Sequence, residues 1–298
     1  MQYKAWFIAL ACIVLVGLYL RLETVKHTNV DTPIRADAKH YTAYAYNLKL
    51  HGVYSRDIST IHKESRQPEP DALRSPGYPT FLSLLVVPNN LKSFITRTVY
   101  VQALISGMTL LLIAYIAYVI SGIRIAAFVT LLAAISPHLT TINTFILTET
   151  LFTFFLLSTL AATTAAIQKN RLILWGLSAL LLSFAALTRP TMQFFIIFLA
   201  AFAWYFSSHE TRRKNVAIVI VVFIGTYTLW FLRNLITLGE LSDPTLTINA
   251  LHHGMYPGFL YNNQPHTFGF PYHYDPDSPY ISASVSNALS AILDRFIN

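Results

Sequence analysis

Hydrophobic residues along the chain gather into long runs that alternate with shorter polar stretches. A helix needs about 20 predominantly apolar residues to cross the hydrocarbon of a bilayer. Seven runs come close to this length, and the third and sixth are the shortest. The runs are Ala5–Leu20, Thr98–Ile120, Ile125–Ser136, Phe145–Ile167, Leu172–Leu187, Phe194–Phe206 and Val216–Leu232. This pattern predicts an all-α polytopic membrane protein with about seven transmembrane helices.

The first run has only some of the features of a signal peptide. Lys4 precedes an apolar core, as in many secretory signals. The following residues, Leu18-Tyr19-Leu20-Arg21, lack the small side chains that a cleavage site requires. We therefore expect an uncleaved first transmembrane helix.

Two long polar segments interrupt the apolar pattern. Residues 21–96 form a first outer loop within a transmembrane domain that covers residues 1–239. Residues 240–298 form an irregular segment rich in Tyr, Pro and Gly, in which Ser282–Ile297 shows the spacing of a terminal helix. No capping signal follows that helix, so the sequence leaves open that the chain is a fragment of a longer protein.

The first outer loop begins with a predicted helix over Asp37–Leu48. Its apolar residues recur at helical spacing on one face, while Lys39, His40 and Asn47 lie mostly elsewhere. That face carries Tyr41, Tyr44, Ala45 and Leu48. The pattern is typical of an interfacial helix that lies on the membrane, and Gly52 is placed to end it.

The rest of this loop is less regular. Residues 75–79 predict a turn, and residues 80–87 are too short to span a membrane. They predict a short helix or a re-entrant piece that Pro88 closes. The segment 56–73 is polar and contains proline, which favours a flexible loop that could cover a site.

The composition agrees with a membrane protein and excludes other classes. Of 298 residues, 54% are hydrophobic and 12% charged, and the mean hydropathy is +0.48. Soluble domains carry about 25% charged residues. The 20 Phe, 17 Tyr and 4 Trp exclude a disordered chain, which would lack them. The single cysteine, Cys12, excludes an intrachain disulfide scaffold.

The basic residues predict the orientation of the chain. The net charge is +7, and basic residues beside apolar spans more often mark the cytoplasmic side than nucleic-acid binding. If the N-terminus is cytoplasmic, the short outer turns carry only Arg189. The short inner segments then carry Lys4, Arg124, Lys169, Arg171, Arg212, Arg213 and Lys214. We therefore expect a cytoplasmic N-terminus and both long polar segments outside.

Four charged residues then share the outer face: Asp37, Glu149, Arg189 and Arg233. An ionisable residue in a membrane helix costs roughly 2.5–3.5 kcal/mol on insertion scales, so each needs a reason. The two arginines could equally snorkel to lipid headgroups, and Asp37 could be a helix N-cap. Glu149 must find a partner or stay protonated. Together the four suit a substrate with an anionic headgroup and a hydrocarbon tail.

Other chemistries have little support in the sequence. There is no phosphate-binding Gly-rich loop, no His-x-x-Glu-His or Cys-x-x-Cys metal spacing and no Gly-x-Ser-x-Gly elbow. His252, His253, His266 and His273 lie in the last outer segment, but adjacent histidines point apart, so a metal site there is the minor interpretation. We assign no metal ligand and no cofactor, and we leave a divalent metal open.

Five short segments together carry a resemblance. They are Asp37-Ala38 with Tyr41, Ala45-Tyr46-Asn47-Leu48 and Gly52-Val53-Tyr54-Ser55; Arg74-Ser75-Pro76-Gly77-Tyr78-Pro79; Ser136-Pro137 with Leu147-Thr148-Glu149; Leu187-Thr188-Arg189-Pro190; and Trp230 with Arg233-Asn234. In this order they resemble the GT-C membrane glycosyltransferases, in the branch of the protein O-mannosyltransferases and the aminoarabinose transferases of lipid A. The resemblance covers residues 1–239. The chain differs from the family in its fewer spans and in lacking an Asp-Glu pair at Asp37.

The resemblance implies a hexosyltransferase with a GT-C-like helical bundle in the bacterial inner membrane. It implies a polyprenyl-phosphate-linked sugar donor and a lipid, glycan or protein acceptor, with membrane lipids but no nucleic acid as further partners. Asp37 corresponds to the catalytic base, Arg189 to the residue that faces the lipid phosphate and Glu149 to the acidic residue of the fourth span. We add Arg233 as a second phosphate ligand. Arg74, Tyr78 and Tyr41 are predicted to support the site.

Two other functions stay open. A flippase for lipid-linked oligosaccharides, or another transporter, would also place charges around an anionic headgroup. Transporters usually bind near the midplane and show internal repeats, and this sequence shows no such repeat. A noncatalytic fragment of a longer transferase is the third interpretation.

Overall fold

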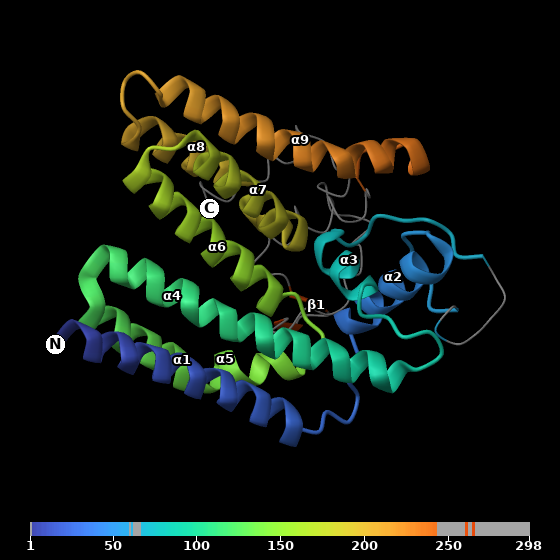
Figure 1. Cartoon of the computed structure of the whole chain (residues 1–298). Coiled ribbons are helices and arrows are strands. Elements are labelled where there is room, and N and C mark those ends of the chain that lie inside the picture. The colour runs from blue at the N-terminus through green and yellow to red at the C-terminus, as the bar shows by residue number, and fades with distance from the viewer. Residues whose placement is uncertain (1, 60, 62–66, 243–259, 262–263, 266–298) are drawn as a thin grey trace. The chain divides into compact units, whose positions relative to one another are not determined.

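The computed structural model describes residues 2–59, 61, 67–242, 260–261 and 264–265 (Figure 1). Their regular structure is helical apart from one pair of short strands. The helices are α1 Gln2–His27, α2 Asp37–His51, α3 Gly77–Ser83, α4 Leu91–Ile135, α5 Pro137–Thr141, η1 Ile142–Thr144, α6 Glu149–Lys169, α7 Leu172–Thr188, η2 Pro190–Phe194, α8 Phe195–Phe206 and α9 Arg212–Leu238. Strands β1 Leu260–Tyr261 and β2 Gln264–Pro265 pair antiparallel. The helix predicted over 282–297 lies outside the described residues.

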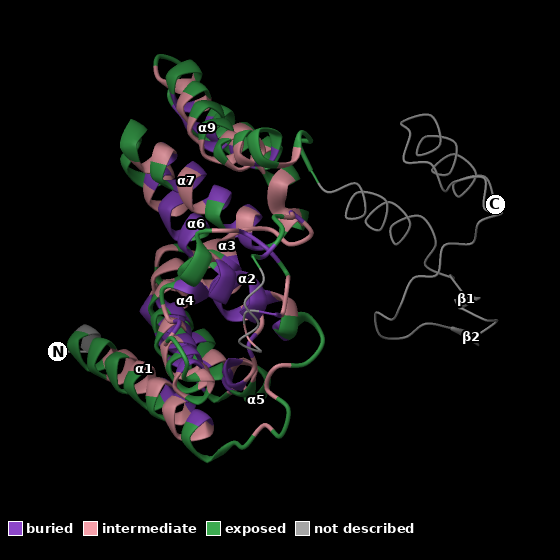
Figure 2. Cartoon of the chain, turned by 90° about the vertical axis from the view of Figure 1, so that its right-hand side faces the viewer, coloured by how far each residue is buried: buried purple, intermediate pink, exposed green. Residues whose placement is uncertain are grey.

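The long apolar helices indicate a multi-pass membrane protein. Within the described residues, four helices are long and apolar enough to cross a bilayer, namely α1, α4, α6 and α9. Helix α7 and the segment made of η2 and α8 are apolar but shorter. These helices contain nearly all residues of the seven predicted runs. Figure 2 shows exposed positions along α1 and α9, where large side chains such as Leu15 and Val221 are 65% exposed. The count of seven crossings stays a prediction.

Helix α4 is a hairpin of two helices. Gly122 has φ 80° and ψ 175°, and this non-helical residue separates 91–121 from 123–135. In one straight helix, residues 106 and 134 would lie about 40 Å apart. Arg21 nevertheless forms hydrogen bonds with both Ser106 and Ala134, so the two halves run side by side. This confirms the predicted division of the region into two apolar runs.

Arg21 joins this hairpin to α1 through hydrogen bonds. The predicted start of the outer loop at residue 21 is wrong, because Arg21 is still part of α1. Helix α1 continues six residues further, and Arg21 is only 1% exposed. Its Nε donates to Ser106 Oγ at 2.8 Å. Its two terminal nitrogens donate to the carbonyl oxygens of Gly17, Ala133 and Ala134, at 2.9–3.2 Å. The last turn of a helix has carbonyls without helical partners, so the guanidinium caps the second half of α4.

Arg21→Met is expected to lower the free energy of unfolding by about 2–4 kcal/mol, because each buried carbonyl or hydroxyl left without a donor costs about 1–3 kcal/mol. Thermal unfolding of the purified protein in detergent measures this change. Arg213→Met, at an exposed position in the first turn of α9, is the matched control and should leave the unfolding temperature nearly unchanged. Equal unfolding temperatures in both variants would show that the carbonyls have other donors.

Helix α2 confirms the predicted helix and its end at Gly52, but its environment differs from the prediction. Gly52 has φ 67°, and its N–H donates to the last helix carbonyls. Residues 41–47 are buried without a break, which includes every side of the helix. Asn47, predicted away from the apolar face, is fully buried and donates to the carbonyls of Ser55 and Asp57. The prediction that one face of this helix is exposed is therefore wrong over residues 41–47, because protein surrounds the helix there.

Helix α3 begins inside the segment predicted to be a turn. Gly77, Tyr78 and Pro79 form its first turn, so the predicted turn over 75–79 is wrong. Proline fits the first turn of a helix because its missing N–H has no helical acceptor there. A short helix in this part of the loop is confirmed, but it ends at Ser83, before Pro88.

The chain divides into two compact units, 1–70 with 75–230 and 71–74 with 231–298. The first unit has two hydrophobic clusters. One cluster packs α2 and α3 against the start of α4 and of α6, and it includes Tyr46, Leu82 and Phe94. The other packs α6, α7, α8 and α9 around Trp175, which is fully buried. The buried positions of α2 and α3 are visible in Figure 2.

Candidate functional site

Glu149 is the first residue of α6, so it lies at the end of the apolar run rather than inside it. The N-terminus of a helix carries partial positive charge, which stabilises a carboxylate. The side chain is 35% exposed, and Oε1 lies 3.5 Å from NH1 of Arg189. The structure thus gives Glu149 the partner that a carboxylate beside a membrane helix requires.

Arg189 directly follows α7 and leaves the helical conformation, with φ −137° and ψ 109°. Pro190 comes next and begins η2. The guanidinium carbon lies 5.6 Å from the ring centroid of Phe152, which is within the range of a cation–π interaction. Its side chain is 44% exposed, and the contact with Glu149 uses one nitrogen of a group that carries five N–H donors. This arrangement can bind an oxyanion beside the ion pair.

Helix α3 meets the end of α7 through Gly77. A Cβ on Gly77 would lie 2.8 Å from the backbone carbon and oxygen of Leu187 and 2.7 Å from Thr188 Oγ1. These distances are too short for any side chain, so only glycine permits this approach of the two backbones. The contact places the residue before Tyr78 next to the residues before Arg189.

Gly77→Ala is expected to lower the free energy of unfolding by about 1–3 kcal/mol, because the methyl group must push α3 away from a rigid backbone. Gly225→Ala is the matched control, since a Cβ at Gly225 in α9 meets nothing within 4 Å. Thermal unfolding in detergent compares the two variants. If Gly77→Ala is as stable as Gly225→Ala, the close packing of α3 on α7 does not exist in solution.

Tyr78, next to Gly77, links the contact between α3 and α7 to buried residues of α4 and η1. It is fully buried, and its hydroxyl donates to Gln102 Oε1, while Gln102 Nε2 donates to carbonyls of the segment 143–145. The ring of Tyr41 meets the ring of Tyr78 edge-to-face, with centroids 5.1 Å apart. Burial raises the pKa of Tyr78 well above its ordinary value, and Tyr41 and Glu149 raise it further. The phenol therefore stays protonated, within electrostatic reach of Glu149.

Asp37 lies one helical turn before Tyr41, on the same side of α2. It is exposed, and the residue at the N-cap position is Ala36, with φ 47°. The N-cap interpretation of Asp37 is therefore wrong, although a carboxylate in the first turn still favours the helix. The structure brings Tyr41, Tyr78, Glu149 and Arg189 together. The catalytic pairing of Asp37 with this group stays a prediction.

The other two predicted residues, Arg74 and Arg233, belong to the second compact unit. Arg233 donates from NH1 to the carbonyl of Asp71 at 2.8 Å and to Oδ1 of Asn234 at 3.0 Å. Arg74 is partly buried in the short segment 71–74 of the same unit. Their predicted roles at the site stay predictions.

A cavity of about 130 Å³ next to Glu149 is lined by a cationic side chain, Arg21, which the sequence analysis did not select as a site residue. Arg21 and Glu149 both line this cavity, with polar side chains that include Ser106, His138 and Thr150. The sequence contains little sign that Arg21 belongs to a transmembrane helix, because the apolar run ends at residue 20. Leu22 and Val25 do continue the helical spacing past Arg21, and they could have shown that the helix extends further.

Metal binding gains no geometric support within the part of the chain that the structure describes, because no three His, Cys, Asp or Glu side chains there form a metal-binding group. The four histidines of the minor metal interpretation, His252, His253, His266 and His273, lie outside the described residues.

No family model, no curated protein and no solved structure matches the chain. The resemblance to GT-C transferases therefore depends on the five sequence segments. The structure itself indicates a multi-pass helical membrane protein with a paired Glu149 and Arg189 at one end of α6.

Proposed function

We propose that this protein is a GT-C-type glycosyltransferase that moves a sugar from a polyprenyl phosphate to an acceptor hydroxyl. The observation that carries this proposal is the meeting of three of the five resembling segments at one end of α6. Gly77 of the second segment packs on Leu187 of the fourth, and Arg189 of the fourth contacts Glu149 of the third. Segments that resembled a family by chance would have no reason to converge.

Donor binding is assigned to Arg189. The donor has an anionic phosphate and a hydrocarbon tail, and Arg189 is a half-exposed cation at the end of an apolar helix. A guanidinium binds two phosphate oxygens at once, which a Lys ammonium cannot do. Glu149 would hold Arg189 in place until the phosphate arrives. The role of Arg233 as a second phosphate ligand stays a prediction from the sequence.

Transfer is proposed to occur in one displacement. The acceptor oxygen attacks the anomeric carbon while its proton passes to the carboxylate of Asp37. The bond from that carbon to the phosphate oxygen breaks, and its electron pair leaves with the lipid phosphate. Arg189 stabilises the negative charge as it grows, so it lowers the barrier more than it strengthens donor binding. A single displacement inverts the anomeric centre.

The orientation is part of the same proposal. The residues at the other end of α6 and in the loop after it, Lys169 and Arg171, are basic, as are three consecutive residues in the first turn of α9. By the positive-inside rule we propose that the Glu149 end of α6 is outside and that the N-terminus is in the cytoplasm. A bacterial inner membrane, and a lipid, glycan or protein acceptor, are what the resemblance adds.

Sugar transfer in detergent tests the proposal. The full chain is purified and incubated with polyprenyl-phosphate sugars that carry a radiolabel, together with an extract of membranes as the source of acceptors. We expect label to move from the donor to an acceptor, or slowly to water as free sugar. Neither product from polyprenyl-phosphate mannose, glucose or aminoarabinose, with protein that unfolds cooperatively, would contradict the proposal.

A transporter of lipid-linked sugars is the second candidate, and the interrupted helix α4 favours it. The half 123–135 is about 20 Å long, too short to cross the hydrocarbon alone. Its C-terminal end is capped by the buried Arg21, and transporters often bind substrates or coupling ions at broken helices within the membrane. In liposomes a transporter would move a fluorescent lipid-linked sugar between leaflets without cleaving it, whereas a transferase would cleave it.

A further inference from the structure

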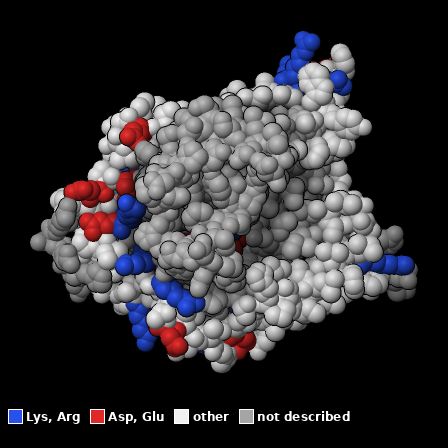
Figure 3. Space-filling view, turned by 180° about the vertical axis from the view of Figure 1, so that it is seen from behind, with Lys and Arg blue, Asp and Glu red and all other residues white. Residues whose placement is uncertain are grey.

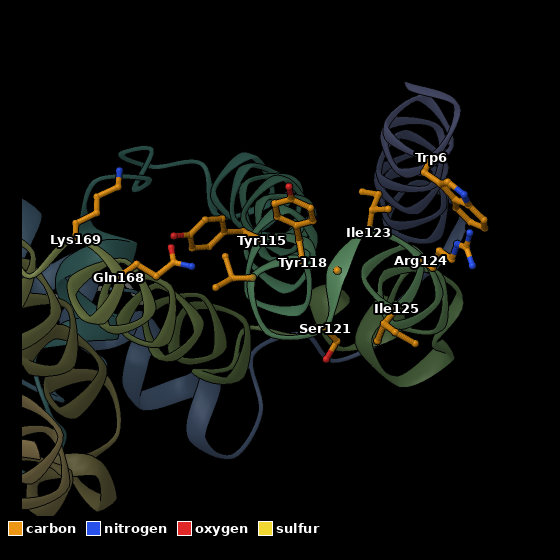
Figure 4. A pocket seen from close by; sticks show the side chains of 11 residues that line it. Trp6, Tyr115, Tyr118, Ser121, Ile123, Arg124, Ile125, Gln168 and Lys169 are labelled. Atoms are coloured by element: carbon orange, nitrogen blue, oxygen red, sulfur yellow. The ribbon is translucent and has the colours of Figure 1, made fainter. Parts of the chain in front are cut away.

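A second cavity, of about 930 Å³, opens at the end of α6 opposite Glu149 (Figure 4). Its lining comes from the start of α1, the turn of the α4 hairpin and the last turn of α6. Gln168 and Lys169 are in that last turn, whereas Glu149 is the first residue of the 21-residue helix. The two ends are separated by about 30 Å, the hydrocarbon thickness of a bilayer. This cavity and the Glu149–Arg189 pair therefore belong to opposite membrane surfaces.

All the charged side chains that line this cavity are positive. Its charged lining residues are Arg124 and Lys169, and both are exposed. The sequence of α4 has no Asp or Glu, and the one carboxylate of α6 is Glu149 at the far end. The first carboxylate of α1 is Glu23, about five turns from Trp6. In Figure 3 the start of α1 is at the right edge, where basic side chains have no acidic side chain beside them in that view.

The other lining residues are those of a membrane–water interface. Trp and Tyr concentrate at that depth, where one end of the ring is apolar and the other is wet. Figure 4 shows Tyr115 and Tyr118 between Lys169 on one side and Trp6 with Arg124 on the other. Next to the cavity in sequence, the apolar side chains Phe7, Ile120 and Ile125 are 49%, 71% and 48% exposed. The cavity thus combines cations and hydroxyls with an adjoining apolar surface.

We propose that this cavity binds the headgroup of an anionic glycerophospholipid. The phosphodiester lies in this cavity, where the Arg124 guanidinium on one side and the Lys169 ammonium on the other make the electrostatic potential positive. The hydroxyls of Tyr115 and Tyr118 donate to the phosphate oxygens or to the glycerol. The acyl chains cover the exposed apolar side chains beside the cavity. This site is independent of the glycosyltransferase proposal, because it uses none of the residues assigned to sugar transfer.

The test measures how many phospholipid molecules the protein keeps in detergent. The full chain is purified free of lipid and mixed with dioleoyl-phosphatidylglycerol or dioleoyl-phosphatidylcholine, and native mass spectrometry counts the bound molecules. The double variant Arg124→Gln/Lys169→Gln is compared with the control Arg213→Gln/Lys214→Gln, which removes the same charge from the exposed start of α9. We expect phosphatidylglycerol affinity to fall about tenfold or more in the first variant and less than twofold in the control.

The wild-type protein gives a second measurement that does not depend on the folding of a variant. It should prefer phosphatidylglycerol to phosphatidylcholine, and salt should reduce the preference by screening the exposed charges. Equal binding of the two lipids would overturn the proposal, as would an equal loss in both double variants. If the protein instead dimerises when lipid is removed, and only the Arg124 and Lys169 variant does not, the cavity is a protein contact and the lipid site is rejected.

Discussion

Asp37→Asn is expected to abolish measurable sugar transfer and to leave donor binding nearly intact. The amide keeps the size of the side chain and its place in the first turn of α2, but it cannot accept the acceptor proton. Loss of a general base lowers the rate by about 10²–10⁴-fold. The turnover number at saturating donor measures the effect, and retention of labelled donor by the protein measures binding.

Asp31→Asn is the matched control for this variant. Asp31 is an exposed carboxylate in the same loop, six residues earlier, and its loss should leave turnover unchanged. If donor affinity falls as steeply as turnover in Asp37→Asn, Asp37 binds the donor rather than activating the acceptor. Full activity of Asp37→Asn would remove Asp37 from the site altogether.

Arg189→Lys is expected to lower kcat/KM by roughly 10- to 150-fold. Lysine keeps the charge and can still reach Glu149, but it loses the bidentate contact with phosphate, worth on the order of 1.5–3 kcal/mol as a charge-assisted hydrogen bond. If Arg189 only reaches toward lipid headgroups, the same variant should be nearly silent, because lysine does this equally well. Initial rates at low donor concentration, with matched amounts of protein, distinguish the two roles.

Arg171→Lys is the control, because Arg171 is the N-cap residue at the opposite end of the same helix α7. It should retain normal kinetics. The corresponding variant of Arg233 should show a smaller loss, since its NH1 already donates to a backbone carbonyl and to Asn234. Normal kinetics in both Arg189→Lys and Arg233→Lys would reject the phosphate role and favour the transporter.

The apolar runs predicted the long helices of the structure, because a helix that crosses a membrane must be apolar over most of its length. The ends of two apolar runs also predicted a break between residues 120 and 125, and the structure has this break at Gly122. Helical periodicity failed for α2, because the spacing of apolar residues alone cannot tell whether water or protein covers the polar side of a helix. Asn47 has the sequence signature of an exposed residue, yet it is buried, and its amide nitrogen donates to two backbone carbonyls 8 and 10 residues further on.

The sequence predicted which residues belong to the candidate site, but not the contacts between them. The sequence selected Glu149 and Arg189 and placed both at the outer face, because a charge beside an apolar run needs a reason, but it did not pair them. Their contact depends on the packing of α6 against α7. The approach of Gly77 to Leu187 could not be foreseen, because a turn and the first turn of a helix share the same residues, Gly and Pro. Arg21 was missed because three of its four hydrogen-bond partners are backbone carbonyls, which leave no trace in the sequence, and the fourth is the neutral side chain of Ser106.

The position of Arg21 has a consequence for biosynthesis. Two of its carbonyl partners, Ala133 and Ala134, are 112 and 113 residues further along the chain. At about 5–20 residues per second, the ribosome needs about 6–20 s to make them after Arg21. During that interval the guanidinium is in the first helix without these acceptors, so water, headgroups or the insertion machinery must solvate it. The hydrogen bonds of Arg21 to Ala133 and Ala134 can therefore form only after the α4 hairpin has been synthesised.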